Sequence, residues 1–382
     1  MTLQYMRTPT RDTPTKLSGR YAANHNPPDK SQQPTRKHAS NSSKNTAKHN
    51  SATQSASPTS DSTKSSHHTT LLLSKKAKDE LCLALRKMGN NKSPGPGQIP
   101  NELLKLTELN EFILSLLNDC FAAGNVPTEF TTTKLAMIPK AGGNLSTPAG
   151  WRYIALMATL AKLFDRVLLN RLSPIITGHL RNEQNGFLPH RSTMQHAAAL
   201  ATIIEDHRTR KDQPLYVIYI DFSNAFPSIT RQAIRAALER FQVPQCLTNA
   251  VLAVYHNHKA FVQTSEGNTD FFYPSAGVLQ GDTLAPFLFV VVLDLVLHKA
   301  IDKHVFISPA YAGVRDLDFA DDIALIANNQ TDAQAMVDRI HKYALRVGLA
   351  INAKKTMFQY IGSDPNPTIS CGGVPLVFFF FF

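Results

Sequence analysis

The sequence predicts a mixed α and β fold, because helix-type and strand-type patterns alternate along the chain and no internal repeat is visible. Apolar residues recur at every third or fourth position in several segments, which is typical of helices that bury one face. Short, β-rich apolar runs lie between these segments. Two of the runs meet aspartates: residues 215–220 stop at Asp221, and Asp321 and Asp322 interrupt a run near the end of the chain.

The expected elements can be placed in order along the chain. Helices are expected at residues 74–88, 160–172, 193–207, 230–241, 284–297 and 331–347. Strands are expected at residues 134–140, 215–220, 260–264, 271–278 and on both sides of residues 321–322, and a short strand is expected to begin at residue 151 and lead into the second helix. Ser74 suits an N-cap, and Gly348 suits the left-handed residue that ends a helix. The helix at 284–297 is apolar apart from Asp294 and shorter than the ~20 residues of a membrane span, which predicts a buried helix.

Residues 1–70 differ in composition from the rest of the chain. They are rich in Ser, Thr, Asn, Gln, His, Pro and Lys and have few large aliphatic residues. Such a segment cannot bury enough apolar surface to offset its ordering entropy, so we expect a disordered tail. It holds ten Lys or Arg and three Asp, which is +7 of the formal net charge of +11. The basicity of the whole chain therefore does not by itself indicate a nucleic-acid groove.

The four cysteines are scattered, with no Cys-x-x-Cys pair and no His at zinc-finger spacing. This pattern predicts free thiols in a reducing compartment and no zinc site. The N-terminus lacks the apolar core of a signal peptide. We therefore expect an intracellular protein, cytoplasmic or nuclear, that is neither secreted nor bound in a membrane.

The adjacent carboxylates Asp321 and Asp322 lie between two strand-like runs, as they would in a β-hairpin. Alone, such a pair is more typical of a solvated turn. Asp221 adds a third carboxylate at the end of another expected strand, and three carboxylates on two strand ends can hold two divalent cations. Mg²⁺ prefers carboxylates, phosphates and water, so aspartates without His or Cys suit it. A metal site and a solvated turn are the two interpretations.

Eight segments in succession are similar to the blocks of a reverse transcriptase, in particular those of non-LTR (LINE-type) retrotransposons. They are NKSPGPGQIPNELLK, KLAMIPKAGG, WRYIALMATLAKLFDRVLLNRL, EQNGFLPHRST, YIDFSNAF, SAGVLQGDTLAPFLFVVVLD, DFADDIALIA and GLAINAKKT. The resemblance covers roughly residues 85–376. The form GVLQGDTLAP is similar to the RTE-like branch of this group.

This resemblance implies an α+β, right-hand polymerase whose ferredoxin-like palm sheet carries packed helices. Fingers are expected at about 71–195 and 242–275 and palm at about 196–241 and 276–361, with the start of a primer-grip region at 362–382. The implied activity is that of an RNA-directed DNA polymerase, which uses template RNA, a DNA primer and deoxynucleoside triphosphates. Asp221 and Asp321 match the two metal-binding carboxylates and Asp322 the third acidic position, which implies two Mg²⁺ ions, with Mn²⁺ as a substitute. The oligomeric state is left open.

The resemblance also assigns roles at the nucleotide. Phe226 matches the steric gate that excludes a 2′-hydroxyl, with a core aromatic as the alternative. Gln280 and Gly281 match the block that contacts the incoming nucleotide and the template. Arg152 matches the arginine that grips the triphosphate, because a guanidinium can bind phosphate oxygens bidentately; a surface ion pair is the alternative.

Two lysines complete the expected nucleotide site. Lys140 is a further phosphate candidate, and its alternative is a solvated loop lysine. Lys355 matches the lysine proposed to protonate the leaving group, although Lys354 beside it leaves this assignment open by one position.

Several positions depart from the family pattern: Gly97, Gln98, Tyr153, Leu188, Asn224 and Pro227. Only 27 residues follow Lys355, and the chain ends in the run Phe378–Phe382. These features predict a divergent copy without a thumb. A catalytically silent, nucleic-acid-binding remnant is therefore the second function class, and the complete set of three aspartates favours the first.

Overall fold

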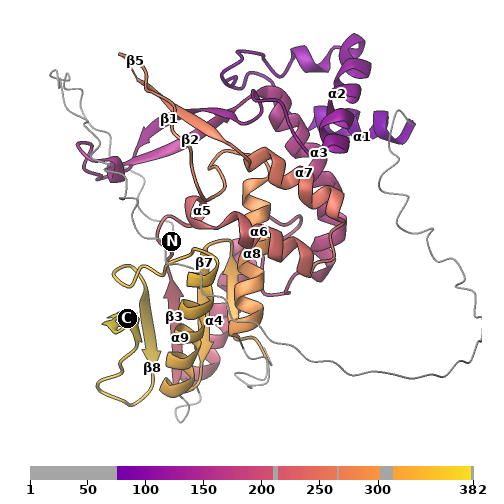
Figure 1. Ribbon diagram of the computed structural model, residues 1–382. Helices are drawn as coiled ribbons and strands as arrows, with labels where there is room; N and C mark the ends of the chain where they lie inside the picture. Colours follow the sequence, from indigo (N-terminus) through magenta and orange to yellow (C-terminus); the bar gives the residue numbers. More distant parts are fainter. Residues whose placement is uncertain (1–74, 210–213, 265, 302–312, 380–382) are drawn as a thin grey trace, which may run out of the picture. The chain divides into compact units, whose positions relative to one another are not determined.

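The computed structural model describes residues 75–209, 214–264, 266–301 and 313–379 (Figure 1). The tail expected at 1–70 lies outside these residues. The helices are α1 (Lys75–Arg86), α2 (Asn110–Ala123), α3 (Thr159–Ile176), α4 (Thr193–Thr209), α5 (Ala225–Ser228), α6 (Arg231–Arg240), α7 (Gln245–Tyr255), α8 (Ala285–Ala300) and α9 (Gln330–Arg346). The strands are β1 (Thr132–Pro139), β2 (Trp151–Met157), β3 (Leu215–Ile220), β4 (Lys259–Thr264), β5 (Gly267–Asn268), β6 (Asp316–Phe319), β7 (Asp322–Ala327), β8 (Met357–Ile361), β9 (Ser370–Cys371), β10 (Val374–Pro375) and β11 (Val377–Phe378).

One sheet has the strand order β11-β8-β3-β7-β6. Strand β3 pairs antiparallel with both β7 and β8, and β6 pairs antiparallel with β7. Because alternate residues of a strand point to opposite faces, β3 buries both of its sides. Leu215 and Val217 pack with α4 on one face, whereas Ile218 and Ile220 belong to the core that contains α6, α8 and α9 (Figure 1). The expected α+β class is confirmed.

The second sheet has the order β2-β1-β4-β5. Strand β1 pairs antiparallel with β2 and parallel with β4. Helices α1, α2, α3 and α7 contact one another and share the main core. This sheet and these helices are formed by segments that lie before and after β3 in the sequence (Figure 1).

Most of the expected helices and strands are present, with ends no more than four residues from the predicted ones. Helix α8 is buried along nearly its whole length, as expected, and Asp294 within it pairs with Arg240 (2.6 Å). Helix α9 ends just before Gly348, whose φ of +91° is left-handed. In the described part of the chain, no helix is long and apolar enough to cross a membrane.

Some expectations were wrong or incomplete. The run 271–278 is not a strand: Phe272 forms one isolated bridge with Ala260, and Phe271, Phe272 and Tyr273 are exposed. The run was predicted as a strand because it contains several aromatic residues, which are common in strands, but these residues are exposed here. Helices α2, α5 and α7 were not among the elements predicted.

Two of the C-terminal phenylalanines, Phe378 and Phe379, have partners in the sheet that contains β3. Phe378 lies in β11, which pairs parallel with β8, and its ring is 5.2 Å from that of Phe358. The ring of Phe379 is 5.7 Å from that of Tyr219 in β3. Both contacts attach this segment to the sheet that ends at Asp221.

Replacing Leu288 of α8 by Ala tests the core. Leu288 is fully buried, so Leu288→Ala should lower the free energy of unfolding by about 2–5 kcal/mol, measured by urea denaturation. The control is Leu345→Ala in α9, where the side chain is 53% exposed and the change should stay within about 0.5 kcal/mol. Equal losses in the two variants would contradict the placement of α8.

Candidate active site

The hairpin of β6 and β7 turns through Ala320 and Asp321. Phe319 is paired with Asp322 across the ladder, so two residues form the connection. Ala320 has a φ of +57°, which belongs to the left-handed region that two-residue hairpin turns require and that residues with a Cβ rarely adopt. The turn therefore needs support from its surroundings.

Asp221 lies at the same end of the sheet as this turn. Ile220 of β3 is paired with Ile323 of β7 in an antiparallel ladder. The next position along β3, Asp221, therefore lies opposite Asp322. The backbone of Asp221 is fixed on both sides: its N–H donates to Thr356 Oγ1 (3.1 Å), and its carbonyl accepts from Asn352 N–H (2.7 Å). The register thus brings together the three carboxylates that the sequence singled out.

These carboxylates influence one another electrostatically. Burial raises the pKa of Asp321, and the charge of Asp221 raises it further. Burial also raises the pKa of Asp322, and the charges of Asp321 and Asp221 add to this effect. Asp221 Oδ2 is buried and has no hydrogen-bond partner among the described residues. Repelling carboxylates and an oxygen without a donor fit a hard divalent cation.

The side chains do not yet form a closed ligand set. In the ranges that the structure describes, no three His, Cys, Asp or Glu side chains are grouped closely enough to hold a metal ion as they stand. Asp322 is exposed, and Asp221 and Asp321 are half-buried, so the site is open to solvent. Binding a cation there requires side-chain adjustment, while the backbone positions are already set by the ladder.

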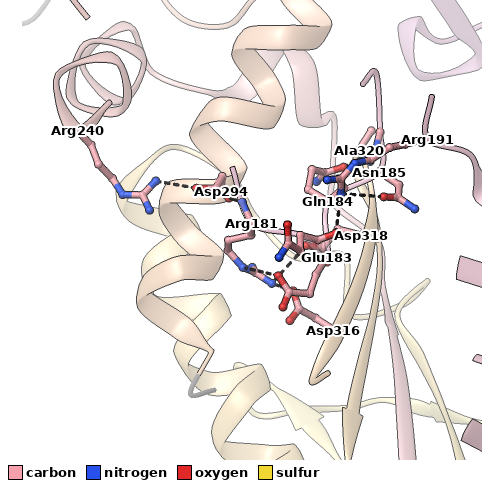
Figure 2. Close-up of polar contacts among 12 residues, drawn as sticks. Arg181, Glu183, Gln184, Asn185, Arg191, Arg240, Asp294, Asp316, Asp318 and Ala320 are labelled. Carbon is pink, nitrogen blue, oxygen red and sulfur yellow. Dashed lines mark hydrogen bonds and ion pairs between the residues drawn. The ribbon is translucent and has the colours of Figure 1, made fainter. Parts of the chain in front are cut away.

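A segment from EQNGF holds the turn in place. Gln184 Oε1 accepts hydrogen bonds from Ala320 N–H (3.0 Å) and Gly186 N–H (2.6 Å) (Figure 2). Gln184 also bridges Asp318 in parallel, so this segment adds to the free edge of β6. A Cβ on Gly186 would lie 2.2 Å from the nitrogen of Ala320, so this position requires glycine.

The segment EQNGFLPHRST was recognised only as similar to a reverse transcriptase block, and no role was predicted for Gln184. The residue is only 1% exposed, and its partner Ala320 is 136 positions away. A polar residue flanked by acidic, amide and glycine positions carries no periodic signal, so pattern alone could not have found it.

Charged side chains are buried behind the hairpin (Figure 2). Arg181 hydrogen-bonds Asp316 and lies 3.7 Å from both Asp318 and Glu183. Burial raises the pKa of Asp318 to about 7, although the positive charge of Arg181 opposes this shift. The Asp294 carboxylate receives a hydrogen bond from the Arg181 backbone N–H (3.0 Å). Strand β6 is thus anchored through its carboxylates, which also explains the Asp within α8.

Phe226 lies in α5, just after Asp221. Its ring stacks on Phe289 of α8, with centroids 4.8 Å apart and planes 20° apart, and meets the edge of Phe187 at 6.5 Å. The ring is half-buried. The carbonyl of Phe226 accepts from Val278 N–H (2.9 Å), which ties α5 to the chain that leads to Gln280.

Gln280 and Gly281 are exposed and packed against β2. The Gln280 carbonyl accepts from Ala155 N–H (2.7 Å). Gly281 has a φ of +109°, and a Cβ on it would lie 2.8 Å from the Ala155 carbonyl oxygen. Arg152 is exposed on the same strand, so strand β2 links three of the expected nucleotide contacts.

The two expected lysines occupy different surroundings. Lys355 is exposed in the turn between Asn352 and Thr356, the two residues that fix Asp221. Lys354 is exposed beside it, so the structure leaves the choice between them open. Lys140 is exposed in the turn between β1 and β2, where its N–H donates to Gly150 (2.9 Å).

The chain is similar to several known proteins. A family model described as reverse transcriptase (RNA-dependent DNA polymerase) matches residues 138–370. The Pol polyprotein of the type-1 retrotransposable element R2 from Nasonia vitripennis is 30% identical over 247 residues, which cover 65% of this chain and 24% of that protein. The RNA-directed DNA polymerase from mobile element jockey of Drosophila melanogaster is 23% identical over 328 residues, covering 82% and 34%.

Among solved structures, apo telomerase from Candida tropicalis truncated from its C-terminal domain has a TM-score of 0.46 at 17% identity and covers 72% of this chain and 59% of that one. The chain spans about a quarter to a third of the length of the two retrotransposon relatives. The family model covers more than half of the chain. This chain therefore belongs to the reverse transcriptase family.

Proposed function

We propose that this chain is an RNA-directed DNA polymerase of a non-LTR retrotransposon, which extends a DNA primer by copying template RNA. The observation that carries the proposal is the β3–β7 register, which sets Asp221, Asp321 and Asp322 at one end of adjacent strands. Family membership supports the reaction, and the R2 and jockey relatives support the retrotransposon origin.

The site residues divide into two groups. Asp221, Asp321 and Asp322 would hold two Mg²⁺ ions, or Mn²⁺ in their place, and such ions activate the primer 3′-hydroxyl and stabilise the leaving pyrophosphate. Because the carboxylates are open to solvent, a triphosphate can reach them. Arg152 and Lys140 supply positive charge for the phosphates from the β1–β2 hairpin, and Gln280 and Gly281 present backbone and amide to the nucleotide.

Lys355 would hold the proton that the leaving pyrophosphate needs, from a turn that also fixes Asp221. Phe226 would exclude ribonucleotides, because its ring is braced from beneath by Phe289 and cannot retreat easily. Both roles require these side chains to face the same nucleotide, which their attachment to the end of β3 supports.

The fingers and palm boundaries belong to the same proposal. Residues 71–195 and 242–275 contain the sheet of β1, β2, β4 and β5, and residues 196–241 and 276–361 contain β3, β6, β7 and β8. The region 362–382, expected to begin a primer grip, pairs with β8 through β11. GVLQGDTLAP favours an RTE-like branch, and the four free cysteines favour a reducing, intracellular compartment.

Primer extension on poly(rA)/oligo(dT) with dTTP and Mg²⁺ tests the activity. Asp321→Asn should lower the rate by at least about 100-fold, the loss typical of removing one electrostatic stabiliser of a transition state. The control is Asp270→Asn, an exposed carboxylate outside the site, which should retain the rate within about twofold.

Activity that survives Asp321→Asn would refute this site. Lack of activity in the unaltered protein, with retained binding of the RNA–DNA hybrid, would instead identify a catalytically silent remnant. Two observations favour the silent remnant as the second candidate. The carboxylates do not form a closed ligand set in the described residues, and the chain departs from the family pattern at Tyr153, Leu188, Asn224 and Pro227.

The requirement for Mg²⁺ should depend on pH. The pKa values of Asp321 and Asp322 are raised, so both carboxyls keep their protons to a higher pH than an ordinary Asp, and a cation must displace these protons. As the pH falls, the Mg²⁺ concentration for half-maximal extension should therefore begin to rise at a higher pH than the ordinary Asp pKa of about 3.9 would give. A Mg²⁺ requirement that rises only near the ordinary pKa of Asp would contradict the raised pKa values.

Sugar selectivity tests the role of Phe226. Phe226→Ala removes the ring that would meet a 2′-hydroxyl, so kcat/KM for UTP relative to dTTP should increase roughly tenfold or more. Phe112→Ala, whose ring is 65% exposed on α2, is the control and should leave this ratio unchanged. A folded Phe226→Ala variant with unaltered selectivity would show that Phe226 is only a core aromatic.

A further inference from the structure

A second acidic group has no role in the proposed metal binding or nucleotide binding. Asp165 of α3, Asp282 in the loop before α8 and Tyr255 at the end of α7 are 0%, 3% and 2% exposed. Burying two carboxylates together is costly unless they are neutralised or hydrogen-bonded. The charged group beside them is Arg166, the next residue of α3.

Asp282 is well supplied with donors. Its Oδ2 accepts from the Tyr255 hydroxyl (2.5 Å), and its Oδ1 accepts from Leu284 N–H (2.9 Å) at the start of α8. These bonds favour the ionised form of Asp282. The hydroxyl of Tyr255 stays protonated, because burial and the charge of Asp282 raise its pKa far above the ordinary value.

Asp165 has no such donors. Neither of its carboxyl oxygens receives a hydrogen bond from an N–H or O–H group of the described residues, and the polar group that it meets is the Asp282 carboxyl. Two ionised carboxylates offer acceptors only, so a hydrogen bond between them requires a proton on one.

We infer that Asp165 is held as a neutral carboxylic acid that donates a hydrogen bond to the Asp282 carboxylate and thereby positions the loop carrying Gln280 and Gly281. Burial raises the pKa of Asp165 well above its ordinary value, and the charge of Asp282 raises it further, while Arg166 opposes the shift. Burial raises the pKa of Asp282 as well, but the hydrogen bonds from Tyr255 and Leu284 oppose that shift, so the proton belongs on Asp165.

The acid pair is directly connected to the loop that carries Gln280 and Gly281. Asp282 directly follows Gly281, and the Gln280 carbonyl is bound to Ala155 of β2. The loop is therefore fixed from two sides, by β2 and by the acid pair. Asp165 and Asp282 are positioning residues, and this part of the inference rests on the proposed nucleotide-binding role of Gln280.

The proton itself can be tested without any activity. Folding takes up a proton at Asp165, so the unfolding equilibrium constant of the wild type should rise tenfold per pH unit between the ordinary pKa of an Asp and the raised value in the folded state. Asp165→Asn keeps the shape and an N–H donor but cannot titrate. Urea unfolding from about pH 4 to about pH 8 should show the wild type losing stability relative to Asp165→Asn, by this factor per pH unit until the raised pKa is passed.

The matched control is Asp119→Asn, an exposed carboxylate on α2, for which the difference from the wild type should not change with pH. A difference between wild type and Asp165→Asn that is also constant from about pH 4 to about pH 8 would overturn the neutral acid. This result is independent of polymerase activity, so failure of the proposed function would leave it interpretable.

The positioning role has a separate readout. Asp165→Ala removes the hydrogen bond and should raise the KM for dTTP in primer extension roughly tenfold, with a smaller effect on kcat. Asp165→Asn should restore the wild-type KM. Equal KM values in all three proteins would overturn the positioning role, and equal defects in the Asn and Ala variants would overturn the hydrogen bond as its cause.

Discussion

Electrostatic repulsion among carboxylates at one end of the sheet shapes much of this molecule. The ladder between β3 and β7 fixes Asp221 beside Asp322, and a shift of one residue would turn these side chains to the other face. The register is specified because β3 is buried on both sides, by α4 and by the core around α8. The apolar strands therefore hold together charges that would otherwise separate.

The surroundings of the hairpin explain how this repulsion is tolerated. Gln184 supports the left-handed Ala320, and Arg181 binds the carboxylate of Asp316 on the strand behind it. A buried ion pair adds little net stability, but removing one partner leaves an uncompensated charge, so such groups fix one arrangement strongly. The hairpin that presents Asp321 is thus held by its backbone and its base, while its tip is left open.

Sequence patterns predicted the parts of this arrangement that are local. Strand β3 was predicted to the residue, because an apolar β-rich run with an abrupt acidic end is visible in a single segment. The ladder of β3 and β7 brings the three predicted aspartates to one end of the sheet. Gln184 and Asp165 were missed for the opposite reason. Asp165 lies on a helix whose apolar stripe was recognised, and nothing in that stripe distinguishes a buried Asp from a solvated one. The run 271–278 was misread because aromatic residues suit strands and exposed surfaces alike.

Aspartates are ionised at the end of β3, whereas Asp165 is protonated. Burial and the neighbouring polar groups account for this difference. Asp221 and Asp321 are half-buried at strand ends, where solvent or a cation can reach their oxygens. Asp165 is fully buried on α3 and has no donor to its oxygens among the described residues, so a proton neutralises it. A family model can align aspartates, but it cannot distinguish these states. The distinction comes from burial and from counting donors at each oxygen, which separates a carboxylate that awaits a metal from one that holds a loop.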